Sequence, residues 1–211
     1  RVVVFWTKNP EPIIPYLKEL DKRGIHYYFQ ITLNDYVNEG FEPNVTSVAK
    51  RIETFKELST MIGREKVIWR FDPMILTDRI SCDDILTKVE SIGEQLKGYT
   101  EKMVFSYADI RTYRKVQSNL EKNGINYREF EAKDMLAIAK GLSELNNSWG
   151  YTLATCGEKV DLESYGVVHN KCVDDDLMIK YFSDDVKLME FLGVEIVKGD
   201  LFNPEDTIIK R

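Results

Sequence analysis

The sequence predicts an α/β protein whose fold is a partial (β/α) barrel of about five to six parallel strands, a truncated TIM-like barrel. Short segments rich in β-branched and aromatic residues alternate with segments of helical periodicity through most of the chain. The helical segments are long enough to form right-handed crossovers between parallel strands. The rival fold, an open doubly wound sheet, is disfavoured because no glycine-rich dinucleotide or phosphate-loop motif follows any strand segment.

The amino-terminal part of the chain alternates strands and helices in a regular order. Residues 2–7 (VVVFWT) are β-branched and aromatic, and the helical spacing that follows them stops at Gly24. Residues 26–33 (HYYFQITL) form the second predicted strand. A helix over 48–62 follows, because the apolar residues of this segment keep to one face. Residues 67–71 (VIWRF) then form the third strand.

The next elements repeat this alternation. Ser81 and Asp84 form a capping box for a helix that ends at Gly98. Residues 103–107 (MVFSY) form the fourth strand. Two helical segments, RTYRKVQSNLEKNG and MLAIAKGLSEL, separate it from the fifth strand, residues 151–155 (YTLAT). The pattern therefore predicts five strands and leaves a sixth open.

The strand and helix pattern weakens after Cys156. We therefore assign residues 1–156 to the partial barrel and residues 157–211 to a carboxyl-terminal extension packed on the same domain. The extension contains a short helical segment (DLMIKYF) and a brief apolar segment (VEIV) that is typical of a strand. The sequence opens at Arg1 inside a predicted strand, so we expect a fragment that lacks at least one amino-terminal element.

Composition restricts the classes of function. Acidic residues outnumber basic residues by 35 to 29, and the net charge of −6 disfavours tight binding to nucleic acid. No apolar run approaches the roughly 18 residues of a membrane helix, and no signal peptide opens the sequence. We therefore expect a cytoplasmic protein that does not bind membranes, with a substrate that is a small molecule or of unknown class. Three cysteines do not form the disulfide framework of a secreted domain.

Polar residues collect on one face of the predicted strands, at their carboxyl ends. Because side chains alternate along a strand, Arg70 and Asp72 share the face opposite Trp69 and Phe71. The aromatic face is expected to meet the helices, so the polar face lies inside the barrel. The same alternation places three further polar residues inside: Gln30, Thr32 and Ser106. Active sites in this architecture lie at the carboxyl ends of the strands, which favours a ligand site here.

Two interpretations of these charged residues stay open. A buried arginine keeps its charge, so Asp72 is either the ion-pair partner that fixes Arg70 or the residue that orients Arg70 toward an anionic ligand. Lys8 is either a catalytic or anion-binding lysine or a solvated loop lysine. Asn9 either contacts a ligand or caps the following helix.

The cysteines raise a similar question. Cys156 and Cys172 lie sixteen residues apart, on a segment with two glycines. Thiolates suit zinc or iron–sulfur iron, but such a metal normally takes four ligands. The pair is therefore either half of a metal site or two ordinary half-buried thiols. Cys82 is expected to be structural, and His169 is a weaker ligand candidate.

Five segments carry a resemblance to a known family: FWTKNPEPIIPYLKELDKRGIHYYFQITLNDY, EPNV, RIETFKEL, VIWRFDPMILTD and TCGEKVDLESYGVVHNKCVDD. They resemble DUF1848, a microbial domain of unknown function. That family is distantly similar to spore photoproduct lyase and to the radical S-adenosylmethionine enzymes, which share a partial or full (β/α) barrel. Its full-length members extend beyond both ends of this sequence. Their tail carries a C-x-C pair and a C-x-x-x-C-x-x-C run of the kind that binds a [4Fe–4S] cluster.

The resemblance implies a radical S-adenosylmethionine-type enzyme core, with S-adenosylmethionine and a [4Fe–4S] cluster as cofactors. It implies a reaction chamber with Lys8, Arg70 and Asp72 in catalytic roles. It places Asn9 and Gln30 in the same chamber, and with Thr32 and Ser106 from the strand alternation they are the predicted cofactor-binding residues. Cys156 and Cys172 are the implied metal ligands, which could join the C-x-C pair around a second cluster. Because the C-x-x-x-C-x-x-C run is absent from these 211 residues, the chain alone is expected to be inactive.

Two other functions stay open. A non-catalytic metal- or ligand-binding barrel would keep the cysteine site without radical chemistry. A barrel hydrolase would use Asp72, Asp109 or Glu158 as a base and would need no iron.

Overall fold

The computed structural model describes residues 1–158, 160–197 and 208–210. Within them, one sheet contains six parallel strands in the order β1-β2-β3-β5-β7-β8. The strands are β1 (Val2–Thr7), β2 (His26–Thr32), β3 (Val67–Met74), β5 (Lys102–Tyr107), β7 (Thr152–Thr155) and β8 (Val167–His169). The spatial order follows the chain order without the reversal of a doubly wound sheet. In the described part of the chain β1 and β8 remain edges, so the sheet is an open, partial barrel and the predicted fold class is confirmed.

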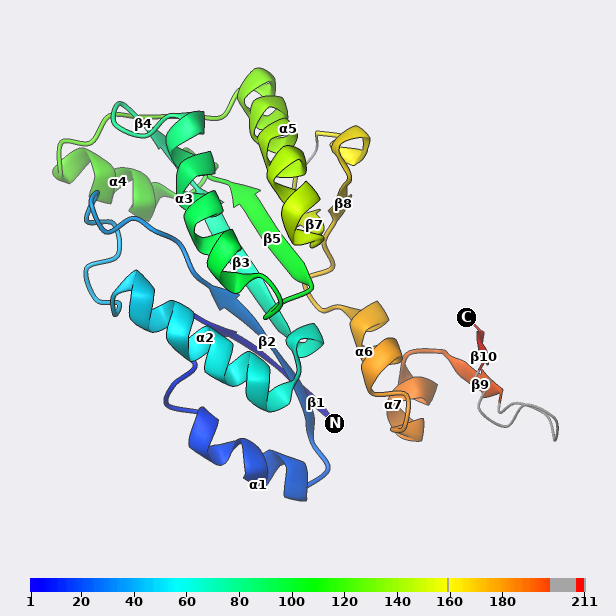
Figure 1. Cartoon of the computed structure of the whole chain (residues 1–211). Helices are drawn as coiled ribbons and strands as arrows, with labels where there is room; N and C mark the ends of the chain where they lie inside the picture. Colours follow the sequence, from blue (N-terminus) through cyan, green and yellow to red (C-terminus); the bar gives the residue numbers. More distant parts are fainter. Residues whose placement is uncertain (159, 198–207, 211) are drawn as a thin grey trace.

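The outer face of the sheet is covered by helices. They are α1 (Leu17–Lys22), α2 (Val48–Ile62), α3 (Cys82–Leu96) and α5 (Ala132–Trp149), whereas α4 (Arg114–Lys122) lies beyond the carboxyl ends of the strands. Figure 1 shows α2, α3 and α5 side by side along this face. Phe29, Trp69, Phe71 and Phe105 point into the layer between sheet and helices and are fully buried. Each such side chain stabilises the fold by about 1.5–3 kcal/mol relative to an exposed position.

The predicted helix signals have the expected geometry. The Ser81 side chain accepts the backbone N–H of Asp84 at 3.2 Å, and the Asp84 carboxylate accepts the backbone N–H of Ser81 at 2.8 Å. This capping box begins α3 as predicted. Short 3-10 turns accompany the helices: Ile14–Tyr16, Arg64–Lys66 and Glu163–Tyr165.

The inner face of the sheet is divided into two halves. Its amino-terminal half is apolar and is covered by α6 (Asp175–Tyr181), through Leu177 and Met178 against Tyr28 and Ile68. A further helix, α7 (Val186–Phe191), follows. Figure 1 places α6 beside the amino ends of the strands, away from the arrowheads. The carboxyl half of the inner face is therefore left to polar residues.

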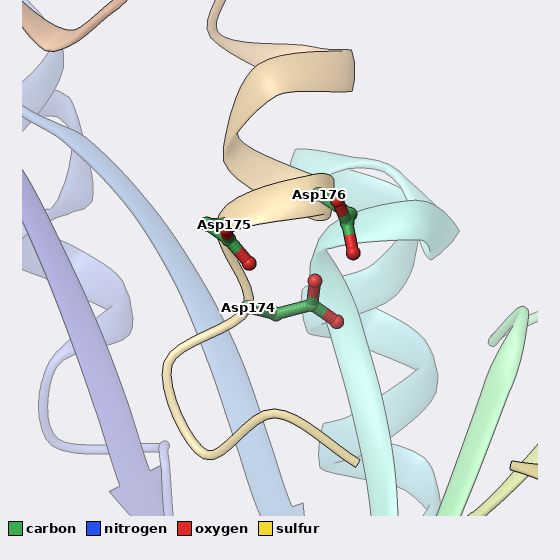
Figure 2. A group of neighbouring side chains, drawn as sticks. All are labelled: Asp174, Asp175 and Asp176. Atoms are coloured by element: carbon green, nitrogen blue, oxygen red, sulfur yellow. The ribbon is translucent and has the colours of Figure 1, made fainter. Parts of the chain in front are cut away.

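Three aspartates begin α6, and Figure 2 shows their carboxylates gathered at its first turn. Asp174 caps the helix by accepting the N–H of Leu177 at 3.0 Å, and it forms a 2.8 Å ion pair with Lys102 of β5. Asp175 and Asp176 both pair with Lys171 at 2.6 Å. These contacts fix α6 on the sheet and account for the acidic cluster as a structural anchor.

Among the described residues, five strands have three residues or fewer, and only the one formed by the VEIV segment was foreseen from the sequence. The sixth strand of the sheet is β8, a three-residue strand after Gly166 that the pattern did not reveal. The VEIV segment forms β9 (Glu195–Val197), which pairs antiparallel with β10 (Ile208–Lys210) outside the main sheet. A second antiparallel pair joins β4 (Leu76–Thr77) to β6 (Tyr127–Arg128). Two or three residues are too few to show a strand period.

Among the described residues, the helices are all too short or too polar to cross a bilayer.

Candidate functional site

The centre of the candidate site is Arg70, which lies on the inner face in the middle of β3. The residue is only 6% exposed, and its guanidinium is held by two neighbours. Nε lies 2.9 Å from Oδ2 of Asp72, and Nη2 donates to the same oxygen. Nη1 lies 2.6 Å from Oε1 of Gln30 on β2. The predicted ion pair therefore forms, and Gln30 belongs to it.

Asp72 is fully engaged in this network. Its Oδ2 accepts two N–H groups of Arg70, and its Oδ1 accepts the hydroxyl of Ser106 on β5. Both carboxylate oxygens of Asp72 therefore have hydrogen-bond partners, and the carboxylate fixes the guanidinium of Arg70. The catalytic role predicted for Asp72 stays a prediction.

Asn34 is a site residue that the sequence interpretation missed. Its side chain is 1% exposed and pairs with the backbone of Asp72 in both directions: Oδ1 accepts the N–H at 2.9 Å, and Nδ2 donates to the carbonyl at 3.2 Å. Pro73 has no N–H, and the ladder between β3 and β5 shifts register between Phe71 and Met74. Asn34 supplies hydrogen bonds at this irregular strand end. The only signal in the sequence is its place directly after the second strand.

The two cysteines that the sequence interpretation paired come together. Cys156 follows β7, Cys172 precedes α6, and their sulfur atoms are 3.6 Å apart. A disulfide would require about 2.05 Å, so both are free thiols. Two thiolates bound to one tetrahedral metal at about 2.3 Å would lie about 3.8 Å apart. The sulfur separation therefore fits two ligands of a tetrahedral metal site.

The thiols also interact with Arg70. The pKa of Arg70 is raised: burial acts to lower it, but Asp72 and then Cys156 outweigh burial. The pKa of the Cys172 thiol is raised, chiefly by its hydrogen bond and charge interaction with Cys156. The Cys172 backbone carbonyl accepts Nε2 of Gln30 at 2.8 Å, which connects the thiol segment to the Arg70 network. The guanidinium keeps one N–H on each Nη for a thiolate or an anionic ligand.

A pocket of about 820 Å³ opens beside this network. Asp72, Ser106 and Cys156 form the wall that it shares with the Arg70 network, and Glu158 and Asp109 lie on the same pocket. Glu158 accepts the backbone N–H of Tyr107 at 3.0 Å. Its pKa is raised, first by burial and then by the charges of Asp109 and Asp72. A volume of this size suits a small organic ligand.

The structure does not bring every predicted site residue to this network. Lys8 forms an ion pair with Glu42, which also pairs with Arg51 at 3.4 Å. Asn9 accepts the backbone N–H of Glu11 at 3.1 Å, the local turn contact of a capping residue. Thr32 lies opposite Arg70 in the register of β2 and β3. The catalytic role predicted for Lys8 and the cofactor roles predicted for Asn9 and Thr32 stay predictions.

Cys82 was predicted to be structural and His169 to be a weaker ligand candidate. The Cys82 sulfur is 3.8 Å from Oδ1 of Asp134, beneath the start of α5. The pKa of the Cys82 thiol is raised, mainly by burial and then by the charge of Asp134. His169 ends β8 and is exposed.

Fold and site together define a class of protein: an open (β/α) barrel with a buried arginine–carboxylate network and a cysteine pair at the carboxyl ends of its strands. The chain belongs to the DUF1848 family, described as a domain of unknown function, whose profile matches residues 1–195. No curated protein matches the chain. The predicted family is therefore confirmed. The comparison does not show the further similarity to spore photoproduct lyase.

Proposed function

We propose that this chain is the substrate-binding core of a radical S-adenosylmethionine-type enzyme. The observation that carries the proposal is the cysteine pair, 3.6 Å apart beside a buried arginine, at the open end of a partial barrel. Active sites of (β/α) barrels lie at this end. The resemblance of DUF1848 to radical enzymes supplies the reaction class.

The residues of this chain do not fit the cluster that cleaves S-adenosylmethionine. Such a cluster takes three thiolates from a C-x-x-x-C-x-x-C run, and the sequence has three cysteines, at positions 82, 156 and 172, without that spacing. Cys82 contacts Asp134 instead of the other two. We therefore derive no step of the reaction through this cluster. Cys156 and Cys172 fit half of a tetrahedral thiolate site whose remaining ligands come from outside the described residues.

The chain's own residues supply binding and orientation. Arg70 is held rigidly by Asp72 and Gln30, and its free N–H groups suit an anionic group of cofactor or substrate. Ser106 holds Asp72 in place from the neighbouring strand. Lys8 and Asn9 would bind the end of the ligand that lies away from Arg70. Lys8 would first have to leave its ion pair with Glu42. Arg70 itself is buried, which shields its guanidinium from water as radical chemistry would require.

Anaerobic reconstitution of the full-length protein with iron and sulfide tests the proposal. We expect iron–sulfur absorbance, an electron paramagnetic resonance signal after reduction, and release of 5′-deoxyadenosine from S-adenosylmethionine. Cys156→Ser and Cys172→Ser should each change the iron content or the spectrum, whereas Cys82→Ser, remote from the pair, should leave both unchanged. Full iron incorporation without any cleavage of S-adenosylmethionine would overturn the reaction class.

A non-catalytic metal-binding barrel is the second candidate, and the same sulfur separation favours it. Zinc takes two thiolates in the same tetrahedral arrangement and needs no reductant. Zinc that stays bound through gel filtration, is lost in Cys156→Ser and is accompanied by no cleavage of S-adenosylmethionine would select this candidate.

A further inference from the structure

The pocket beside the Arg70 network has an apolar wall on the side away from the strands. The wall is formed by residues of α4, of the loop before α4, of the loop before α5 and of the first turn of α5: Ile110, Tyr113, Val116, Phe130 and Met135. The pocket lies at the carboxyl ends of β5 and β7, where Tyr107 and Cys156 also line it. An apolar wall of this extent suits the hydrocarbon or aromatic body of an organic ligand better than a bare metal ion.

The charge on the pocket is unbalanced. Four carboxylate residues line it (Asp72, Asp109, Glu129 and Glu158), against one basic residue, Arg111. Arg70 neutralises Asp72, and Glu129 accepts the backbone N–H of Arg111 at 3.0 Å with the Arg111 side chain 4.0 Å away. Within the described ranges, Asp109 and Glu158 have no cationic partner. Two carboxylates on one pocket without a cation attract a positively charged ligand.

Glu158 is placed to receive such a ligand. One of its oxygens accepts the N–H of Tyr107 at 3.0 Å, and the half-buried carboxylate has no ion-pair partner in the described part of the chain. Asp109 is exposed at the mouth and accepts the Thr112 hydroxyl at 2.5 Å.

We propose that this pocket binds a primary-amine ligand, with the ammonium group at Glu158 and Asp109 and the apolar body against Tyr113 and Phe130. The amine would be the substrate class of the proposed enzyme. Only the word substrate rests on the proposed function. Binding itself requires neither iron nor S-adenosylmethionine.

Three probes that share a phenylethyl body test the inference: 2-phenylethylamine, 2-phenylethanol and 3-phenylpropanoate. Their head groups are positively charged, neutral and negatively charged. Dissociation constants are measured by isothermal titration and by ligand-observed nuclear magnetic resonance at neutral pH. We expect the amine to bind at least about tenfold more tightly than the alcohol, and the carboxylate not to bind. Equal binding of amine and alcohol, preference for the carboxylate, or no binding of any probe would overturn the proposal.

Variants assign the binding to the pocket. Glu158→Gln and Asp109→Asn should each weaken amine binding about five- to tenfold, and the alcohol should bind as before. Glu144→Gln, an exposed carboxylate on α5 that pairs only weakly with Lys140, is the matched control and should bind the amine like the parent protein. Thermal unfolding shows whether each variant is folded. Because Asp109 is exposed, Asp109→Asn still tests the pocket if Glu158→Gln does not fold. Amine affinity unchanged in both pocket variants would place the binding elsewhere.

Two outcomes separate this inference from the proposed function. Amine binding that survives in a protein unable to cleave S-adenosylmethionine supports the pocket and refutes only the reaction class. Cleavage of S-adenosylmethionine in a protein that binds no amine refutes the pocket and leaves the reaction class. Tight binding of Mn²⁺ that excludes the amine would identify a metal site instead and would overturn the proposal.

Discussion

Arg70 and Gln30 are joined across two neighbouring strands, with Nη1 of the arginine 2.6 Å from Oε1 of the glutamine. In the register of the sheet Arg70 lies opposite Thr32 and Gln30 opposite Ile68, so the contact is diagonal. Gln30 then donates to the carbonyl of Cys172. The position of the guanidinium therefore depends on β2 and on the cysteine segment as well as on its own strand.

Loss of this guanidinium should destabilise the protein strongly. We expect Arg70→Met to lower the free energy of unfolding by about 3 kcal/mol, because it leaves the partly buried Asp72 without its counter-charge. Urea unfolding at neutral pH measures the change. Arg23→Met, which removes an exposed ion pair with Glu19, is the control and should change stability by less than about 0.5 kcal/mol.

A second substitution distinguishes loss of charge balance from loss of packing. Arg70→Met combined with Asp72→Leu should be more stable than Arg70→Met alone, because no charge is left unpaired. If the double variant is the less stable of the two, the network contributes through packing and not through the ion pair.

The cysteine pair predicts a pH-dependent reactivity. The pKa of the Cys172 thiol is raised mainly by Cys156, so less thiolate is present near neutral pH than in an ordinary exposed cysteine. Cys156→Ser should therefore speed the alkylation of Cys172 by iodoacetamide about threefold or more at mildly alkaline pH. Mass spectrometry of the modified peptide follows the rate. An unchanged rate in Cys156→Ser would show that the two sulfurs do not interact in solution.

The strand faces were predictable because side chains alternate with period two. Trp69 and Phe71 point to the helices while Arg70 points inward, as this period requires. The amino half of the inner face was not predictable, because α6 reaches Tyr28 and Ile68 only through tertiary packing. The DLMIKYF segment revealed a helix but not the surface that it covers.

The candidate site was predictable in part for the same reason. The polar face of the strands identified Gln30 and Asp72, which contact Arg70, and Ser106, which donates to Asp72. The sequence could not show that Glu42, on a loop far along the chain, pairs with Lys8. Nor could it show Asn34 completing the backbone contacts of Asp72, because a lone asparagine after a strand is a common turn residue.

An ion pair beneath α5 predicts a stability change with pH. Arg128 donates to Asp134, with Nη2 2.9 Å from Oδ1, and this contact is the main cause that lowers the pKa of Asp134 to about 2. Arg128 is half exposed, so we expect Arg128→Met to cost about 1–2 kcal/mol at neutral pH. The pKa of Asp134 is lower in the folded protein than in the unfolded chain. The stabilisation by this ion pair is therefore fully present above pH 3.8 and is lost as the pH falls toward about 2.

Unfolding of parent and Arg128→Met measured at neutral pH and near pH 2 checks this sign. The difference between the two proteins should shrink at the acidic end. Lys133→Met, whose ion pair with Glu131 is exposed, is the control and should leave the stability nearly unchanged at both pH values. A difference that grows on acidification would contradict the assigned role of Asp134.

The raised pKa of Glu158 predicts how the amine pocket responds to pH. Burial and the charges of Asp109 and Asp72 favour the protonated carboxyl, so Glu158 loses its charge at a higher pH than the ordinary 4.5. The affinity for 2-phenylethylamine, which stays protonated over this range, should therefore fall as pH is lowered through that raised pKa. In Asp109→Asn one repulsive charge is gone, and the midpoint of the fall should move to lower pH. In Glu158→Gln the amine should bind more weakly, and its affinity should no longer fall over this pH range. A fall that persists in Glu158→Gln would show that another group titrates.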